Sequence, residues 1–328
     1  MGSSGLRKFS KLTCFSTLFL IFAGGMVTST GSGLAVPDWP LSYGTFFPPM
    51  IGGVFYEHGH RMIASLVGFL TLCLASWLAL KEQRKWIKIL GFCALAAVLF
   101  QGILGGITVI FFLPTAVSVA HAVMAQTFFI LTIIIAYSLS LEREARSQQT
   151  PAPEGFLRCL LGFVILIYIQ LILGAIMRHT GSGLAILDFP TMGGYWFPPF
   201  NEKMLTNINV WRFDLNLEPI SMTNVILHFI HRMGAFLIIV FLCLIDILGM
   251  KLYRKNELLF RTLVLVNILV AIQIILGIFA VLTIKTPIIT SFHVVTGAAI
   301  LGMAVLLLLR TAPLSLNEFQ RKLIYHEK

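Results

Sequence analysis

Four histidines of this 328-residue sequence form two pairs with nearly the same spacing. His60 and His121 are 61 residues apart, and His231 and His293 are 62 residues apart. A single histidine in an apolar helix more often packs or makes a hydrogen bond, but matching pairs can face each other inside a helix bundle and bind a haem iron from both sides. Zinc takes three or four ligands, so the pattern favours two bis-histidine haem sites over zinc.

A glutamate distinguishes the two pairs. Glu57 lies three residues before His60 and shares its helix face, whereas the same position before His231 holds His228. A carboxylate beside one haem only suggests that the N-terminal half performs a reaction and the C-terminal half carries electrons. The alternative is an interfacial glutamate near a helix N-terminus, stabilised by the helix dipole.

An arginine follows one histidine of each pair directly. Arg61 and Arg232 can bind haem propionates, because the planar guanidinium matches a carboxylate with two hydrogen bonds. They can equally extend to the membrane interface as ordinary long cationic side chains. The spacing leaves both alternatives open.

The elements that must position these residues are membrane helices. Hydrophobic residues make up 57% of the chain and charged residues 12%, with a mean hydropathy of +0.89, which excludes a soluble protein. The net charge of +10 does not indicate a nucleic-acid partner, because the cations fall in short clusters between apolar segments. We therefore expect an all-α integral membrane protein in a lipid bilayer. Its predicted transmembrane helices are 12–30, 59–80, 89–112, 117–140, 158–177, 223–248, 262–283 and 288–310.

The distribution of cations predicts the orientation. Eighteen of the 24 Lys and Arg residues fall on one side if the N-terminus is cytoplasmic, so both termini are expected in the cytoplasm. Loops 31–58 and 178–222, and with them the haem-binding ends, are then extracytoplasmic, in a multi-pass protein of the cell (inner) membrane. The first apolar segment is interpreted as a retained helix, because no A-x-A cleavage site follows it.

The two large loops are copies of each other. Residues 31–49 and 181–199 are identical at eleven of 19 positions, and both begin with Gly-Ser-Gly-Leu-Ala. This repeat predicts two parallel, tandem four-helix bundles, spanning 1–140 and 158–328, with a cytoplasmic linker at 141–157. A transporter built from two repeats is disfavoured, since the spans carry almost no charged residues. Gln101, Gln170 and Gln273 precede glycines and are expected to support helix packing, with the amide bonding a neighbour.

The first large loop is also unusual in composition. Residues 36–50 are rich in aromatic side chains and proline, and they are too apolar for a free linker. They are predicted to lie on the outer membrane face, either as a lid over a porphyrin or as a structural interfacial loop.

These residues together resemble the haem A synthase family over essentially the whole chain. The similarity is carried by Gly31-Ser-Gly-Leu, Pro37-Asp-Trp-Pro-Leu, Glu57-His-Gly-His-Arg61 and His121, with their counterparts in the second half. The resemblance implies oxidation of a ring methyl of haem O to the formyl group of haem A, the cofactor of haem–copper terminal oxidases. It implies that His60 and His121 hold the substrate haem, that Glu57 is essential to the chemistry, and that His231 and His293 hold a haem b that relays electrons.

The chain departs from many bacterial members of that family, which carry a cysteine pair in the first outer loop where this sequence has Val36 and Ser42. No thiol-dependent step at that loop is therefore expected. The main rival is a diheme b-type cytochrome that passes electrons, linked to quinol, without modifying haem. Expected partners are haem O itself, a haem O synthase that supplies it, a membrane electron acceptor such as a quinone, and a second copy in a homo-oligomer.

Overall fold

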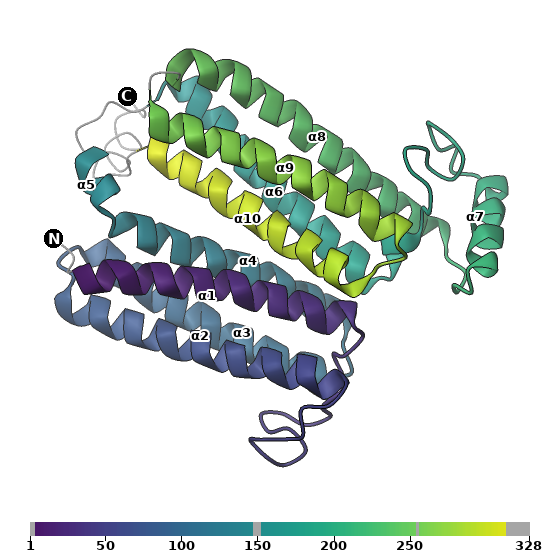
Figure 1. Cartoon of the computed structure of the whole chain (residues 1–328), viewed down its shortest axis with the longest axis horizontal. Coiled ribbons are helices and arrows are strands. Elements are labelled where there is room, and N and C mark those ends of the chain that lie inside the picture. The colour runs from purple at the N-terminus through teal and green to yellow at the C-terminus, as the bar shows by residue number, and fades with distance from the viewer. Residues whose placement is uncertain (1–3, 147–151, 254–255, 313–328) are drawn as a thin grey trace, which may run out of the picture.

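The computed structural model describes residues 4–146, 152–253 and 256–312, and they fold as a bundle of long helices (Figure 1). Eight helices in this part of the chain are long and apolar enough to cross a membrane, as predicted. They are α1 (Ser4–Ser29), α2 (Gly53–Lys81), α3 (Lys85–Ile110), α4 (Thr115–Ser138), α6 (Glu154–His179), α8 (Met222–Tyr253), α9 (Glu257–Leu282) and α10 (Pro287–Thr311). Three shorter helices are α5 (Leu141–Arg146), α7 (Glu202–Asp214) and the 3₁₀-helix η1 (Ser182–Leu184).

Most of the long helices extend beyond the apolar segments that predicted them. A backbone in a bilayer must make its hydrogen bonds within the helix, and these bonds continue into the polar interface, where hydropathy gives no signal. Threonine hydroxyls inside the spans are satisfied in the same way: Thr17 and Thr71 donate to the carbonyl four residues earlier. Helix α9 begins one residue after Asn256, whose side chain accepts from the Leu259 amide as an N-cap.

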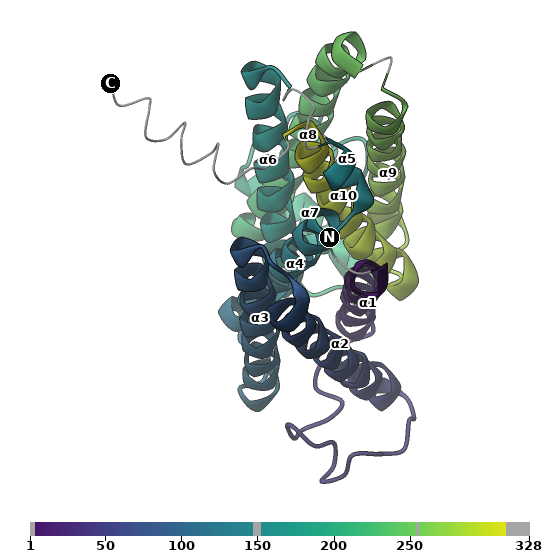
Figure 2. The ribbon, with the colours of Figure 1, turned by 90° about the vertical axis from the view of Figure 1, so that its left-hand side faces the viewer.

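The helices pack in two groups. In the first, α1 and α3 each contact α2 and α4, and in the second, α6 and α9 each contact α8 and α10. The groups meet where α1 and α4 pack against α10 and where α4 packs against α6, as the end view in Figure 2 shows. A Cβ on Gly302 of α10 would lie 2.9 Å from the side chains of Phe129 and Ile133 on α4, so the absence of a side chain lets these helices approach closely.

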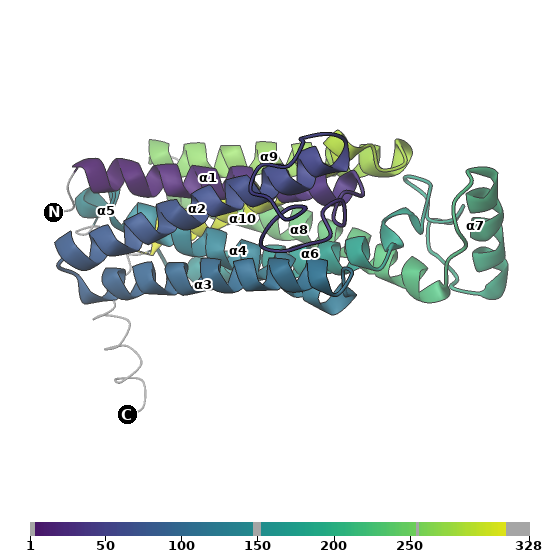
Figure 3. The ribbon, with the colours of Figure 1, turned by 90° about the horizontal axis from the view of Figure 1, so that it is seen from below.

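The two large loops lie at the same end of the molecule, and α1 begins and α10 ends at the other (Figures 1 and 3). The cytoplasmic placement of the termini and the domain boundaries near 140 and 158 stay predictions. Part of the predicted linker, residues 147–151, lies outside the described residues. So do His326 and the predicted cytoplasmic cations Arg254, Lys255, Arg321, Lys322 and Lys328.

Helix α7 has no counterpart in the first half. It is formed by part of the insertion that makes the second large loop longer, and it stands beyond the ends of the long helices (Figure 3). Met204 and Ile208 on its inner face are buried against Ile186 and Met192 of the loop. The apolar face of α7 is too short to indicate a membrane-spanning helix, so the pattern of apolar segments did not predict this helix.

Candidate functional site

The four paired histidines occupy equivalent places near the large-loop end of the molecule. Each lies within the first ten residues of its helix, on α2, α4, α8 and α10. His60 is close enough to His121 to interact with it electrostatically, and His231 is likewise close to His293. The structure thus brings together the members of each predicted pair.

Each histidine ring packs against a glycine of a neighbouring helix. A Cβ added to Gly24 would lie 3.1 Å from Cε1 of His60, and one added to Gly105 would lie 3.3 Å from Cε1 of His121. The second half repeats the arrangement: Gly174 faces Cε1 of His231 at 3.3 Å, and Gly277 faces Cε1 of His293 at 3.0 Å. An added Cβ at any of these four glycines, the glycine cradles of the rings, would lie closer to the ring than an ordinary van der Waals contact, so the ring would have to shift to admit it.

Three of the cradle glycines follow a glutamine by four residues, on the same helix face. Nε2 of Gln101 donates to the carbonyl of His121 at 3.0 Å, and Nε2 of Gln170 donates to the carbonyl of His231 at 2.8 Å. Nδ1 of His293 lies 3.2 Å from the carbonyl oxygen of Gln273. The neighbour that the amides were expected to bond is therefore a histidine in two cases. The spacing Gln-x-x-x-Gly is visible in the sequence and places both residues on one helix face. Only the structure shows that this face contacts a histidine.

The histidines of the first pair also retain free ring nitrogens. Nδ1 of His60 and Nδ1 of His121 are buried and have no hydrogen-bond partner among the described residues. Buried polar atoms are nearly always satisfied, and a neutral imidazole nitrogen is a common iron ligand. The pairing, the glycine cradles and these nitrogens fit a haem at the first pair, and the pairing and the cradles alone fit one at the second, where Nδ1 of His231 and of His293 each have a partner at 3.2 Å.

Glu57 is buried, with 4% of its surface exposed, and both carboxylate oxygens are engaged. Oε1 accepts from Nη2 of Arg61 at 2.6 Å, and Oε2 accepts from the backbone amide of Val36 at 2.8 Å. The carboxylate therefore ties the start of the first large loop to α2, one helical turn from His60.

Arg61 completes this attachment. Its Nη1 donates to the carbonyls of Asp38 at 2.7 Å and Leu41 at 2.9 Å, and Nη2 also reaches the Val36 carbonyl at 3.3 Å. Arg232 does the same in the second half, donating to the carbonyls of Thr191 and Ile186, each at 3.1 Å. Both arginines hold the loops, and their binding of propionates stays a prediction.

His228 occupies the position of Glu57 and contacts the equivalent partners. The amide of Ile186 donates to its Nδ1 and Nε of Arg232 points at its Nε2, both at 3.2 Å. A neutral imidazole has one acceptor nitrogen, so it can accept only one of these two donors, whereas a carboxylate accepts both. The duplicated site is thus matched to its donors in the first half and mismatched in the second.

The loops themselves are held by an aspartate each. Asp38 accepts from the amides of Tyr43 at 2.7 Å and Gly44 at 2.8 Å, and these amide bonds hold the pKa of the exposed carboxyl below its usual value. The carboxyl of Asp188 accepts from Gly193 at 2.7 Å and Gly194 at 2.9 Å in the same way. Both turns use residues in the left-handed region, where glycine costs least.

Ser42 adds one contact to the first loop. Its buried hydroxyl lies 2.8 Å from Nδ1 of the buried His58, which places His58 against the first large loop. The aromatic side chains Phe46 and Phe47 at the loop tip are 73% and 85% exposed. A loop held at its base with exposed aromatics at its tip suits the membrane interface.

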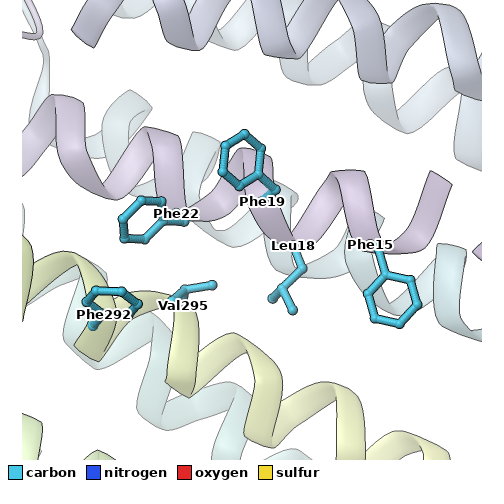
Figure 4. A pocket seen from close by; sticks show the side chains of 6 residues that line it. All are labelled: Phe15, Leu18, Phe19, Phe22, Phe292 and Val295. Atoms are coloured by element: carbon cyan, nitrogen blue, oxygen red, sulfur yellow. The ribbon is translucent and has the colours of Figure 1, made fainter. Parts of the chain in front are cut away.

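An apolar groove of about 390 Å³ opens between α1 and α10, where the two groups of helices meet (Figure 4). Phe22 of α1 and Phe292 of α10 face each other across it, with ring centroids 5.1 Å apart. Phe292 directly precedes His293, so the groove reaches the depth of the histidines. The remaining lining residues are Phe15, Leu18, Phe19 and Val295.

Comparison with known proteins identifies relatives of the whole helical region. The protein named "Heme A synthase" from Alkalihalophilus pseudofirmus is 29% identical over 289 residues, which cover 85% of this chain and 88% of that protein. Proteins of the same name from Halalkalibacterium halodurans and Symbiobacterium thermophilum are 29% and 26% identical, over 85% and 77% of this chain and 87% and 78% of their own lengths. The profile of the COX15-CtaA family, described as cytochrome oxidase assembly protein, matches residues 52–306, and the chain therefore belongs to that family.

Proposed function

We propose that this protein is a haem A synthase, which oxidises a ring methyl group of haem O to the formyl group of haem A for haem–copper terminal oxidases. Relatives that carry this name match most of the chain. The observation that carries the proposal is Glu57, a buried carboxylate one helical turn from His60 and present in one half of the duplication only.

The paired histidines have different tasks in this proposal. His60 and His121 hold the iron of the haem O substrate against Gly24 and Gly105. His231 and His293 hold a resident haem b, which supplies one-electron transfer when bound. The glycine cradles restrict the orientations of the imidazole rings that would hold the two irons.

Glu57 acts on the methyl group. His60 and His121 would both be engaged with the iron of the substrate. Conversion of the methyl to the formyl group would then take its oxygen atom from water and release four electrons and four protons, with the electrons passing to the membrane acceptor. The carboxylate of Glu57 stabilises the electron-poor methyl carbon or takes the proton released from it. Loop 36–50, held down by Arg61, covers this end of the site and limits access of bulk water.

The remaining assignments concern the surroundings. The protein spans the cell (inner) membrane with its histidine end on the extracytoplasmic side, as the distribution of cations favours. Electrons pass to a membrane acceptor such as a quinone, a haem O synthase supplies the substrate, and the protein forms homo-oligomers.

The experiment that tests this function is chemical analysis of the bound haem. The full chain is purified from cells that also make haem O, and extracted haem is examined by pyridine haemochrome spectra and mass spectrometry. Haem A or a hydroxylated haem O beside haem b supports the synthase. Haem b alone favours the rival, a diheme b-type cytochrome linked to quinol, and a protein without haem overturns the assignment of the histidines.

Glu57→Ala and Glu57→Gln test the catalytic residue in the same preparation. Both variants are expected to keep the low-spin haem spectrum and to contain unconverted haem O. Because Glu57 also holds Arg61, haem content is measured first, so that loss of the site is distinguished from loss of the reaction. Normal accumulation of haem A in either variant contradicts the role of Glu57.

A further inference from the structure

The two halves differ at their outer end by a set of cations. Lys285, in the turn between α9 and α10, matches Leu113 in the turn between α3 and α4, and both residues have the same left-handed backbone with φ of 59°. Arg178, near the end of α6, matches Thr28 near the end of α1. The duplication has therefore placed two cations in the second half where the first half is uncharged.

These cations converge on the segment around η1. The Cβ position of Gly183 lies 2.7 Å from Cε and 3.0 Å from Nζ of Lys285, so the lysine side chain lies over this glycine. Nη1 of Arg212, from α7, donates to the carbonyl of the next residue, Leu184, at 2.6 Å. Arg178 precedes the segment by four residues, and its Nη2 donates to Oγ of Ser29 at 2.7 Å.

Two of these cations lack a carboxylate partner in the described part of the chain, whereas the third, Arg212, is within electrostatic range of Glu218. Among the residues that the structure describes, neither Arg178 nor Lys285 forms an ion pair with a carboxylate. Burial, followed by the charges of Arg178 and Arg212, lowers the pKa of the Lys285 ammonium. Partly buried cations without an anion are costly, and an arginine with one hydroxyl acceptor leaves most of its donors unused.

The cluster lies at the outer edge of the second histidine pair. Arg178 is four residues after Gly174, the cradle of His231, and so lies one turn further out on the same face of α6. Arg178 is also within electrostatic range of His293. An anion bound by these cations would therefore belong to whatever the two histidines hold.

We propose that Arg178 and Lys285 bind a propionate carboxylate of the haem held by His231 and His293. This inference rests on the proposed function. A guanidinium and an ammonium at one carboxylate form charge-assisted hydrogen bonds, and Arg232 is already engaged with loop carbonyls. The asymmetry has a functional sense: the second half retains its haem, whereas the first half must release its product and carries Thr28 and Leu113 instead.

The test compares haem b with its dimethyl ester, which lacks the carboxylate charge. The detergent-solubilised full chain carries His60→Ala and His121→Ala, so that only the second pair binds haem, and it is titrated with each compound after removal of bound haem. This parent protein is expected to bind haem b at least about tenfold more tightly than the ester. Lys285→Leu and Arg178→Thr, which install the residues of the first half, are expected to remove most of that preference.

Lys285→Arg is the matched control, because it keeps the charge and should keep the preference for haem b. A second readout is the reduction potential of the bound haem, which is expected to fall in Lys285→Leu, since a nearby cation stabilises the reduced form. Lys285→Leu keeps the contact between Arg178 and Ser29, so it does not disturb the packing of the two halves.

The remaining outcomes overturn either the propionate assignment or the proposed function. An unchanged preference for haem b in both Lys285→Leu and Arg178→Thr overturns the propionate assignment while leaving the haem site intact. The propionate assignment is also overturned if inorganic phosphate stabilises the haem-free chain, and if Lys285→Leu removes this stabilisation without changing the preference for haem b. That result would indicate a site for a free anion. If the parent protein binds neither haem compound at His231 and His293, the proposed function itself fails.

Discussion

The imidazole ring of His60 packs against the bare α-carbon of Gly24, where an added Cβ would lie 3.1 Å from Cε1. The same relationship recurs for the other three paired histidines, although the eight residues lie on eight different helices. An imidazole held on one side by backbone has little freedom to rotate. The glycine cradles therefore restrict the orientations of the four rings.

A methyl group in a cradle is expected to disturb the ring that it faces. In Gly105→Ala the added Cβ would lie 3.3 Å from Cε1 of His121, so the ring must move, at a cost of about 1 kcal/mol or more. We expect weaker haem binding by about tenfold at the first site and a change in its low-spin absorption and electron paramagnetic resonance spectra. Haem titration with both spectra checks this.

Gly102→Ala is the matched control on the same helix. Nothing lies within 4 Å of its Cβ position, and it gains the same helix propensity of up to roughly 1 kcal/mol. Its haem binding and spectra are expected to match those of the unchanged protein. Equal effects of the two substitutions would show that the cradle does not constrain His121.

The sequence predicted the helices better than the contacts between them. Eight apolar segments and a duplicated loop were sufficient for the all-helical fold and for equivalent places of the four histidines. The contacts between the glycines and the histidine rings were not predicted, because a glycine and a glutamine on one helix face are also typical of ordinary helix packing. The role of Arg61 depends on the carbonyls of Val36, Asp38 and Leu41, which the folded loop brings to one guanidinium and which no spacing along the sequence reveals.

Loss of the Arg61 guanidinium is expected to loosen the first loop. Arg61→Lys keeps a positive charge beside Glu57 but cannot reproduce hydrogen bonds to several carbonyls in different directions. We expect hydrogen exchange of residues 36–42 to become at least about fivefold faster, since each lost bond contributes roughly 1 kcal/mol. The matching loop in the second half, held by Arg232, serves as the internal control and should exchange unchanged; faster exchange in both loops would indicate general unfolding instead.

The second loop should be sensitive to acid through Asp188. Partial burial raises the pKa of this carboxyl, but hydrogen bonds from Thr191 and from the Gly194 and Gly193 amides outweigh it, so the pKa is lowered overall. The stabilisation is therefore complete above the unfolded pKa of about 3.9 and is lost as the pH falls through the lower folded value. Exchange of residues 188–197 should be slow at neutral pH and accelerate, beyond the intrinsic dependence, at about pH 3.

Asp188→Asn removes this titration. Its loop should be less stable than that of the unchanged protein at neutral pH and should show no further loosening between about pH 5 and pH 3. If the variant and the unchanged protein respond to acid alike, another group controls the loop.

The mismatch at His228 predicts a stabilising substitution at a buried position. His228→Glu supplies two acceptor oxygens to the Ile186 amide and to Arg232, as Glu57 does for Val36 and Arg61. We expect slower hydrogen exchange at Ile186, corresponding to roughly 1 kcal/mol. His228→Gln is the control, because its amide offers one acceptor oxygen and should leave the exchange rate nearly unchanged. Faster exchange in His228→Glu than in the unchanged protein would mean that the imidazole is the better partner for these donors, and that the two halves have diverged to suit different groups at this position.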